Sequence, residues 1–210
     1  MEIKAALFDF DGVVCDTESQ YTVFWGEICR EYHPEHPGLE IEIKGSTLEQ
    51  IYDRWFSGAL ASVRESITER LDRFEAQMDY TCISGFEPFV SNLRQRGIMT
   101  AVVTSSNIPK MQSVYAKRPE FRQLFDAILT SEDFAKSKPD PDCYLRAAQR
   151  FGVSPSDCVV FEDSFNGLKS GRAAGMYVVG LATTNTADAI RNYCDEVIPD
   201  FKTHVRILKN

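Results

Sequence analysis

The feature that most restricts the fold of this 210-residue sequence is a regular alternation of short apolar runs with segments of helical periodicity. Apolar runs, each typical of a buried strand, occupy residues 5–10, 98–103, 127–129, 158–161, 177–181 and 196–198. Helical patterns lie between them at residues 88–96, 109–115, 140–151, 164–174 and 187–193. Short strands that alternate with helices indicate a parallel sheet with helices on both faces, so we predict an α/β fold.

The first apolar run is separated from the others by a long segment without a strand pattern. This segment begins with apolar side chains spaced three and four residues apart, at Tyr21, Phe24, Ile28 and Tyr32. Two further helices are expected where capping-box sequences begin, at Ser46 and at Ser62. We therefore predict a Rossmann-like α/β core formed by residues 1–16 and 84–210, with an inserted α-helical cap domain at residues 17–83.

Composition and charge are those of an ordinary globular protein and argue against two classes of partner. Hydrophobic residues make up 43% of the sequence, and the formal net charge is −8. An acidic chain without a basic run is a poor match for nucleic acid or for an anionic membrane surface. No apolar run approaches the roughly 18 residues that cross a bilayer, and the first residues lack the pattern of a signal peptide. We therefore expect a cytoplasmic monomer that acts on a small molecule.

The six cysteines are scattered along the sequence and form no C-x-x-C pair. In a chain of this length, that distribution is typical of small buried residues rather than of disulfides or a zinc site. We expect all six to be free thiols.

Polar and charged residues follow the predicted strands at the ends where open α/β sheets bind ligands. The first strand runs into Asp9 and Asp11, the second is followed by residues 104–107, and the fourth by residues 162–163. Lys138 lies in the loop before the helix that begins near residue 140. Because the carboxyl ends of parallel strands meet at one edge of a sheet, we expect four carboxylates, a hydroxyl cluster and a lysine in one crevice.

Carboxylates gathered this closely repel one another unless a cation is bound, so the cluster indicates a divalent metal. Oxygen ligands without a nearby histidine favour Mg²⁺ over zinc. A site with Mg²⁺, hydroxyls and a lysine suits a phosphoryl group, and the sequence contains no G-x-x-x-x-G-K-[ST] loop. The remaining route is a carboxylate nucleophile that forms an aspartyl-phosphate, with a second carboxyl group as acid and base.

Four segments resemble, in order, the four motifs of the haloacid dehalogenase superfamily. Residues Phe8 to Glu18 are similar to the first motif, Thr104 to Ser106 to the second, Lys138 to Pro141 to the third, and Phe161 to Ser164 to the fourth. The resemblance covers nearly the whole chain, including the position of the helical cap. It is strongest to the subgroup that contains β-phosphoglucomutase and small sugar-phosphate phosphatases, and it implies phosphoryl-transfer chemistry.

The resemblance implies a role for each residue that matches a motif. Asp9 corresponds to the nucleophile, and Asp11 to the general acid that protonates the leaving oxygen and then activates water. Mg²⁺ would be held by Asp9, Asp163 and the backbone carbonyl of Asp11. Glu162 would assist directly or through water. Lys138 would neutralise charge on the nucleophile and on the transferred group.

Further residues are candidates for substrate binding. The resemblance gives Thr104 and the backbone amide of Ser105 the role of holding phosphoryl oxygens. Asn166 lies one turn beyond the metal ligands, and Lys44 belongs to the cap, from which we expect specificity to come. We therefore predict a substrate-binding set of Ser105, Ser106, Asn107, Lys44 and Asn166, beside the catalytic set of Asp9, Asp11, Thr104 and Lys138.

Other activities share parts of this pattern. Dehalogenases of the superfamily lack the second aspartate of the first motif, phospho-receivers have no cap after the first strand, and an inactive domain would have lost a catalytic residue. The related mutases carry a cap arginine where this chain has Leu48, and a histidine where it has Tyr21. We predict a Mg²⁺-dependent phosphatase of a small phosphorylated metabolite, a sugar phosphate in class. The alternatives are a β-phosphoglucomutase-type phosphohexomutase and a specialised pyrophosphate or phosphonate hydrolase.

Overall fold

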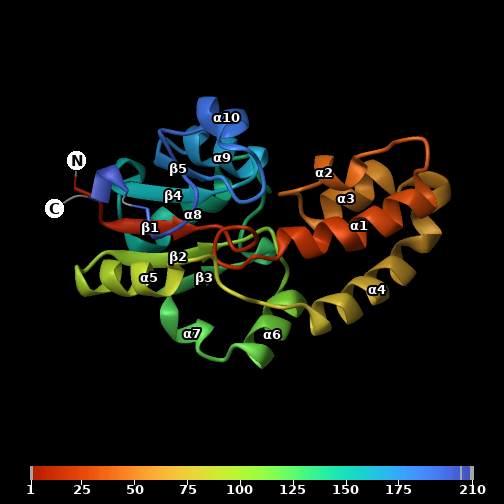
Figure 1. Cartoon of the computed structure of the whole chain (residues 1–210), viewed down its shortest axis with the longest axis horizontal. Helices are drawn as coiled ribbons and strands as arrows, with labels where there is room; N and C mark the ends of the chain where they lie inside the picture. The colour runs from red at the N-terminus through yellow and green to blue at the C-terminus, as the bar shows by residue number, and fades with distance from the viewer. Residues whose placement is uncertain (1, 204, 209–210) are drawn as a thin grey trace.

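The computed structural model describes residues 2–203 and 205–208, and these residues form one sheet of six parallel strands (Figure 1). The strands are β1 (Ala5–Phe8), β2 (Met99–Val103), β3 (Ala127–Leu129), β4 (Cys158–Glu162), β5 (Tyr177–Leu181) and β6 (Glu196–Ile198). Their order across the sheet is β3-β2-β1-β4-β5-β6, and every neighbouring pair is parallel. This arrangement confirms the predicted α/β fold with a Rossmann-like sheet.

Side chains of the strands alternate between two hydrophobic layers, as the two-residue repeat of a strand requires. In β1, Ala6 and Phe8 face one layer, and Ala5 and Leu7 face the other. The first layer contains α5 (Phe86–Gln95), α6 (Ile108–Lys117) and α7 (Phe121–Leu124), and the second contains α8 (Asp142–Phe151), α9 (Phe165–Ala173) and α10 (Ala187–Ile190). Because helices cover both faces, each strand appears in the sequence as a continuous apolar run.

Residues 18–77, which we call the helical segment, lie to one side of the sheet (Figure 1). They form α1 (Glu18–Tyr32), α2 (Leu39–Glu42), α3 (Leu48–Trp55) and α4 (Arg64–Gln77). A short 3-10 helix at Gly58–Val63 lies between α3 and α4. Further 3-10 helices lie outside this segment, at Ser131–Asp133, Pro155–Asp157, Arg191–Tyr193 and Arg206–Leu208. The helical segment has a hydrophobic cluster of its own, which includes Phe24, Trp25, Ile28, Ile51, Phe56, Ile67 and Leu71. Trp25 belongs to this cluster, and Trp55 packs against it.

The chain enters and leaves the helical segment through two connections that lie side by side. The amide of Asp16 donates to the carbonyl of Thr81 at 2.9 Å, and the amide of Ile83 donates to the carbonyl of Val14 at 3.0 Å. Cys15 and Cys82 form an isolated antiparallel bridge between these hydrogen bonds. The helical segment is thus joined to the sheet by two short connections that are hydrogen-bonded to each other.

Two helix starts differ from the sequence prediction. The capping box of α3 is formed by Thr47 and Gln50, one residue later than the expected pair beginning at Ser46. α4 begins at Arg64 without a side-chain cap, because a 3-10 turn at Gly58–Val63 leads directly into it. The prediction of a capping box at Ser62 is therefore wrong, although the helix it announced is present.

Two predictions from the sequence concern the cysteines and the length of the apolar segments. All six cysteines are free, and four of them are buried, whereas Cys82 and Cys194 are partly exposed. None of the helices in the described part of the chain is long and apolar enough to cross a membrane.

Candidate active site

Three buried carboxylates gather at the carboxyl ends of β1 and β4, in the middle of the sheet. Asp9 follows β1, Glu162 ends β4, and Asp163 comes directly after it. One oxygen from each lies within 4.8 Å of the others. From β1 and β4 the sheet continues in opposite directions, and ligands of open α/β sheets bind at such switch points. The fold therefore brings together three of the four carboxylates that the sequence singled out.

Lys138 reaches this cluster from the loop before α8 and is completely buried. Its Nζ atom lies 2.7 Å from Oδ1 of Asp9 and 2.7 Å from Oε1 of Glu162. A third contact, at 3.0 Å, runs to the backbone carbonyl of Val103. An ammonium group has three N–H donors, so each of them has a partner here. Lys138 is fixed between the end of β2 and two of the acidic groups.

Burial raises the pKa of two of these carboxylates despite the nearby lysine. Burial raises the pKa of Asp9 to about 7, although the charge of Lys138 opposes the shift. Burial also raises the pKa of Asp163 well above its ordinary value, and Glu18, Glu162 and Asp9 add to the effect. For Lys138, burial lowers the pKa, but the charges of Asp9 and Glu162 outweigh it and raise the pKa overall. Three carboxylates against one buried ammonium form a donor set that fits a divalent cation.

Glu162 is held from several sides. Its Oε1 accepts hydrogen bonds from Lys138 and from the Tyr144 hydroxyl, the latter at 2.8 Å. Its Oε2 accepts from the Ser164 hydroxyl at 3.2 Å and from the amide of Asp163 at 3.1 Å. Both oxygens are thus occupied by protein donors, which fixes the orientation of the side chain.

A tight turn at Gly12 lets the chain pass close to Asp163. Gly12 has a φ of +74°, and a β-carbon placed on it would overlap the carboxylate of Asp163 and the hydroxyl of Thr184. The Thr184 hydroxyl donates to Oδ2 of Asp163, and Asn185 donates to its backbone carbonyl at 2.9 Å. The hydroxyl of Thr183 donates to the carbonyl of Gly12 at 2.6 Å. Glycine is needed here for both its conformation and its lack of a side chain.

The sequence analysis missed residues 183–185, although they follow β5 at the same edge of the sheet. A signal was available, because a run of two threonines and an asparagine comes soon after an apolar strand. The same argument that selected the ends of the first, second and fourth strands applies to this run.

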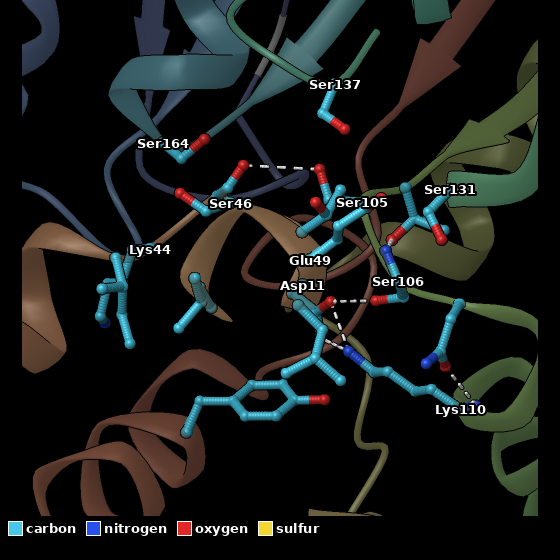
Figure 2. A pocket seen from close by; sticks show the side chains of 18 of the residues that line it. Asp11, Lys44, Ser46, Glu49, Ser105, Ser106, Lys110, Ser131, Ser137 and Ser164 are labelled. Atoms are coloured by element: carbon cyan, nitrogen blue, oxygen red, sulfur yellow. Dashed lines mark hydrogen bonds and ion pairs between the residues drawn. The ribbon is translucent and has the colours of Figure 1, made fainter. Parts of the chain in front are cut away.

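The carboxylate of Asp11 has hydrogen-bond partners other than the three clustered carboxylates. Its Oδ1 accepts from the Thr17 hydroxyl at 2.5 Å, and its Oδ2 accepts from the Ser106 hydroxyl at 2.9 Å. The Nζ atom of Lys110 lies 2.5 Å from both oxygens (Figure 2). The side chain of Asp11 is not part of the cluster of metal-ligating groups among the described residues. The predicted contribution of Asp11 to a metal site concerns its backbone carbonyl and is separate from this carboxylate.

The loop after β2 lies beside these groups. Thr104 is buried, and its hydroxyl accepts a hydrogen bond from the amide of Ser106 at 3.0 Å. The Ser105 hydroxyl lies 3.4 Å from the carbonyl of Gly45 in the helical segment. The Asn107 side chain caps α6 by accepting from the amide of Lys110 at 3.0 Å. Of the predicted substrate-binding residues in this loop, Asn107 therefore also has a structural role.

A cavity of about 660 Å³ lies between the sheet and the helical segment. Asp9, Asp11 and Asp163 open into it, as do Thr104 and the residues that follow it. Figure 2 shows Lys44 and Ser46 on one side of this cavity and Ser106 and Lys110 on the other. Lys44 lies 3.1 Å from a carboxylate oxygen of Glu18. Asn166 is not among the residues that line the cavity; it lies on α9 near Gly45.

Lys110 was also missed by the sequence analysis. It is the third residue of α6 and is almost fully buried. In the sequence it looks like an ordinary lysine on an amphipathic helix. Its partner Asp11 is 99 residues away in the chain, so no local spacing could indicate the contact.

Comparison with known proteins agrees with this geometry. The model of the haloacid dehalogenase-like hydrolases matches residues 3–175. The chain is 30% identical to validoxylamine A 7'-phosphate phosphatase of Streptomyces hygroscopicus, over 97% of this chain and 96% of that protein. It is 29% identical to the β-phosphoglucomutase of Bacillus subtilis, over 85% of this chain and 83% of that protein. The crystal structure of a haloacid dehalogenase hydrolase from Entamoeba histolytica has a TM-score of 0.82 and 25% identity, and covers 98% of this chain and 96% of its own.

The matched range takes in every strand end that contributes a carboxylate to the site. This chain belongs to the haloacid dehalogenase-like hydrolase family.

Proposed function

We propose that this protein is a Mg²⁺-dependent phosphatase whose substrate is a small phosphorylated metabolite of the sugar-phosphate class. Hydrolysis would proceed through an aspartyl-phosphate intermediate. The observation that carries the proposal is the position of Asp9. Its carboxylate opens into the cavity, is held at one oxygen by Lys138 and stands beside Glu162 and Asp163. A carboxylate so placed can attack a phosphoryl group that enters from the cavity.

The proposed chemistry has two steps. Asp9 attacks phosphorus while Asp11 gives a proton to the oxygen that leaves, and the ester bond breaks. Asp11 then takes a proton from water, which attacks the same phosphorus and frees Asp9 and inorganic phosphate. Lys138 remains against Asp9 in both steps and offsets the negative charge that the phosphoryl group brings.

The residues present fit the metal that the resemblance implies, because three buried carboxylates have oxygens within 4.8 Å of one another and Lys138 contacts only two of them, Asp9 and Glu162. Asp9, Asp163 and the backbone carbonyl of Asp11 would hold Mg²⁺. When bound, Mg²⁺ supplies positive charge to the phosphoryl oxygens. Both oxygens of Glu162 already accept hydrogen bonds from the protein, which supports a contact through water rather than a direct one.

The loop after β2 would bind the phosphoryl group. Thr104 and Ser105 lie at the cavity with Ser106 and Asn107, and hydroxyl and amide donors of this kind suit phosphoryl oxygens. Lys44 would contact the far part of the substrate. Asn166 stays a prediction, because it would have to reach the substrate from outside the present cavity lining.

We assign residues 17–83, which contain the helical segment, the role of a cap. Its own hydrophobic cluster and its narrow paired connection to the sheet support a unit that can move as a body. The cavity lies beneath it, so such a cap would select substrates and limit the entry of water.

The pairing of the positive side chains favours a phosphatase over a mutase. Among the described residues of the helical segment that line the cavity, the basic ones are Lys44 and Arg64. Lys44 is paired with Glu18. Arg64 donates to the carbonyls of Phe56 and Tyr52 at 2.6 and 2.7 Å and lies near Asp53. Both cations are therefore engaged by the protein, whereas a mutase needs a cation that grips a second phosphate.

Phosphate release tests the proposal directly. The purified protein with Mg²⁺ is supplied with a panel of sugar phosphates, other metabolite phosphate esters, pyrophosphate and a phosphonate, and the same panel is supplied to Asp9→Asn. We expect release from at least one ester by the wild type and none by the variant. Release from pyrophosphate or a phosphonate alone would replace the proposal with the specialised hydrolase.

A further inference from the structure

Lys110 contacts both carboxylate oxygens of Asp11, the proposed acid–base residue. It is 1% exposed, and its Nζ atom lies 2.5 Å from each carboxylate oxygen of Asp11. Figure 2 shows the side chain extending from α6 across the edge of the cavity to reach Asp11. Burial of a lysine is costly unless the charge is paired, so this position of Lys110 depends on the carboxylate.

The surroundings of Lys110 belong to two parts of the molecule. Its Nζ atom lies 5.4 Å from the ring centre of Phe10, next to Asp11, and 4.5 Å from the ring centre of Tyr21 in α1. The hydroxyl of Tyr21 donates to Oε1 of Glu75 in α4 at 2.7 Å. A path of contacts at the wall of the cavity therefore runs from Asp11 through Lys110 and Tyr21 to Glu75, from the core to the helical segment.

The other donors to Asp11 carry no charge, and each contacts only one oxygen of the carboxylate. Thr17 and Ser106 are neutral, and each donates to a different oxygen of the carboxylate. Lys110 is the charged donor to both oxygens, and a charge-assisted contact is roughly twice as strong as a neutral hydrogen bond. The orientation of the carboxylate therefore depends most on this ammonium group.

Lys110 does not belong to the predicted phosphoryl-binding groups. Those groups, and Lys138, contact Asp9 or come from the loop that directly follows β2. The ammonium of Lys110 instead contacts Asp11 and lies near two aromatic rings. Its position points to the acid–base residue rather than to the nucleophile.

We infer that Lys110 is a positioning residue that orients the Asp11 carboxylate for proton transfer and ties that orientation to the helical segment through Tyr21. The inference rests on the proposed function, since it assigns a support to the acid–base step of that reaction. Its consequence is specific: the loss of Lys110 should impair reactions that need a proton on the leaving oxygen more than reactions that do not.

Two aryl phosphates of similar shape separate these reactions. Phenyl phosphate has a leaving oxygen that must be protonated, whereas p-nitrophenyl phosphate has a much better leaving group. The wild type, Lys110→Met and Lys110→Arg are mixed in excess with each ester plus Mg²⁺, and release of the phenol in a single turnover is measured by rapid quench. Lys169→Met is the matched control, because Lys169 is an exposed lysine whose ammonium lies near the Tyr193 ring.

We expect Lys110→Met to slow release of phenol by about 10-fold or more and release of nitrophenol by less than about 3-fold, since a general acid contributes roughly 10²- to 10⁴-fold in full. Lys110→Arg should recover part of the loss with phenyl phosphate, and Lys169→Met should match the wild type with both esters. Equal losses with the two esters, or no loss with either, would overturn the inference.

A second measurement guards against a general defect in folding. Lys110→Met is combined with Asp11→Asn, which also removes the carboxylate left without its partner. If Lys110 acts through Asp11, the double variant should be no slower with phenyl phosphate than Asp11→Asn alone. A double variant slower by the full factor seen for Lys110→Met would overturn the inference. A wild type that releases inorganic phosphate from neither aryl ester and from no ester of the metabolite panel would contradict the proposed function itself, and the inference would fall with it.

Discussion

The Nζ atom of Lys138 lies 2.7 Å from Oδ1 of Asp9, and the side chains are 1% and 11% exposed, respectively. The same ammonium lies 2.7 Å from Glu162. Lys138 therefore fixes one oxygen of Asp9 and leaves the other to the cavity side. This arrangement makes separate predictions for the two partners, since Asp9 carries the proposed reaction and Lys138 supports it.

Replacement of Asp9 by asparagine should abolish phosphate release and leave the fold intact. The amide is nearly the same size as the carboxylate, but it cannot attack phosphorus or contribute charge to a metal site. Phosphate release on the best substrate of the panel and circular dichroism measure the two outcomes. Asp188→Asn, a change at a residue whose side chain is 94% exposed, is the control and should keep full activity. Activity above a few per cent in Asp9→Asn would rule out Asp9 as the nucleophile.

Replacement of Lys138 by methionine should lower both activity and stability. The change leaves Asp9 and Glu162 buried without their shared cation, and removal of one partner from a buried pair costs about 3–5 kcal/mol. Urea unfolding of the wild type and the variant measures this loss. Lys169→Met again serves as a control. A variant with an unchanged unfolding midpoint would show that other groups already balance the two carboxylates.

The sheet was the most predictable part of the fold. The ranges of β3, β5 and β6 agree with the apolar runs, because strands buried on both faces need apolar side chains at every position. β1 is shorter than its apolar run and ends at Phe8. The chain leaves the sheet there because Asp9 and the turn at Gly12 form the site, and an apolar pattern does not show where such a turn begins.

Other features depend on contacts that no local pattern encodes. Both Ser46 with Glu49 and Thr47 with Gln50 satisfy the capping-box rule, and the observed box starts at Thr47 because Ser46 closes the preceding turn on Ile43. The pairing of Lys110 with Asp11 likewise depends on α6 packing beside the first loop. The motif carboxylates were accessible from sequence because each lies at the end of a strand or soon after it, whereas Lys110 lies inside a helix.

Activity should depend strictly on Mg²⁺. The three carboxylates lie close together, and the pKa of Asp9 and of Asp163 is raised by burial, so these groups need a cation to share the site as anions. EDTA should remove activity, and added Mg²⁺ should restore it. Ca²⁺ should inhibit, since its longer bonds and higher coordination number would misplace Asp9 for attack. Full phosphate release in excess chelator would contradict this prediction.

Replacement of Glu75 by glutamine should reduce the loss of stability at higher pH. Burial raises the pKa of Glu75 above 4.5, with Asp11 and Asp72 acting in the same direction, while Lys110 and the hydrogen bond from Tyr21 oppose the shift. The folded protein therefore binds more protons at Glu75 than the unfolded chain does, and this contribution to stability decreases as the pH rises through that range.

Urea unfolding between about pH 5 and pH 8 measures the effect, since stability follows the difference in bound protons between the two states. We expect a smaller decrease for Glu75→Gln than for the wild type. Glu69→Gln, at an exposed position of the same helix, should behave as the wild type does. The prediction fails if Glu75→Gln and the wild type lose the same free energy of unfolding over this range.

The product formed from β-glucose 1-phosphate separates the phosphatase from the mutase. A mutase must keep water away from its phosphoenzyme and must hold a second phosphate with a cation of fixed geometry, which arginine supplies best. In this chain Leu48 lines the cavity at the position where related mutases carry arginine, and Lys44 is paired with Glu18. We therefore expect that any turnover of β-glucose 1-phosphate, with or without a bisphosphate activator, yields inorganic phosphate and no glucose 6-phosphate. A coupled assay for glucose 6-phosphate is run beside phosphate release on the same enzyme, and Leu48→Arg is measured in parallel as a variant that restores the missing cation. If the wild type accumulates glucose 6-phosphate faster than free phosphate, the phosphatase proposal is wrong and the protein is a mutase.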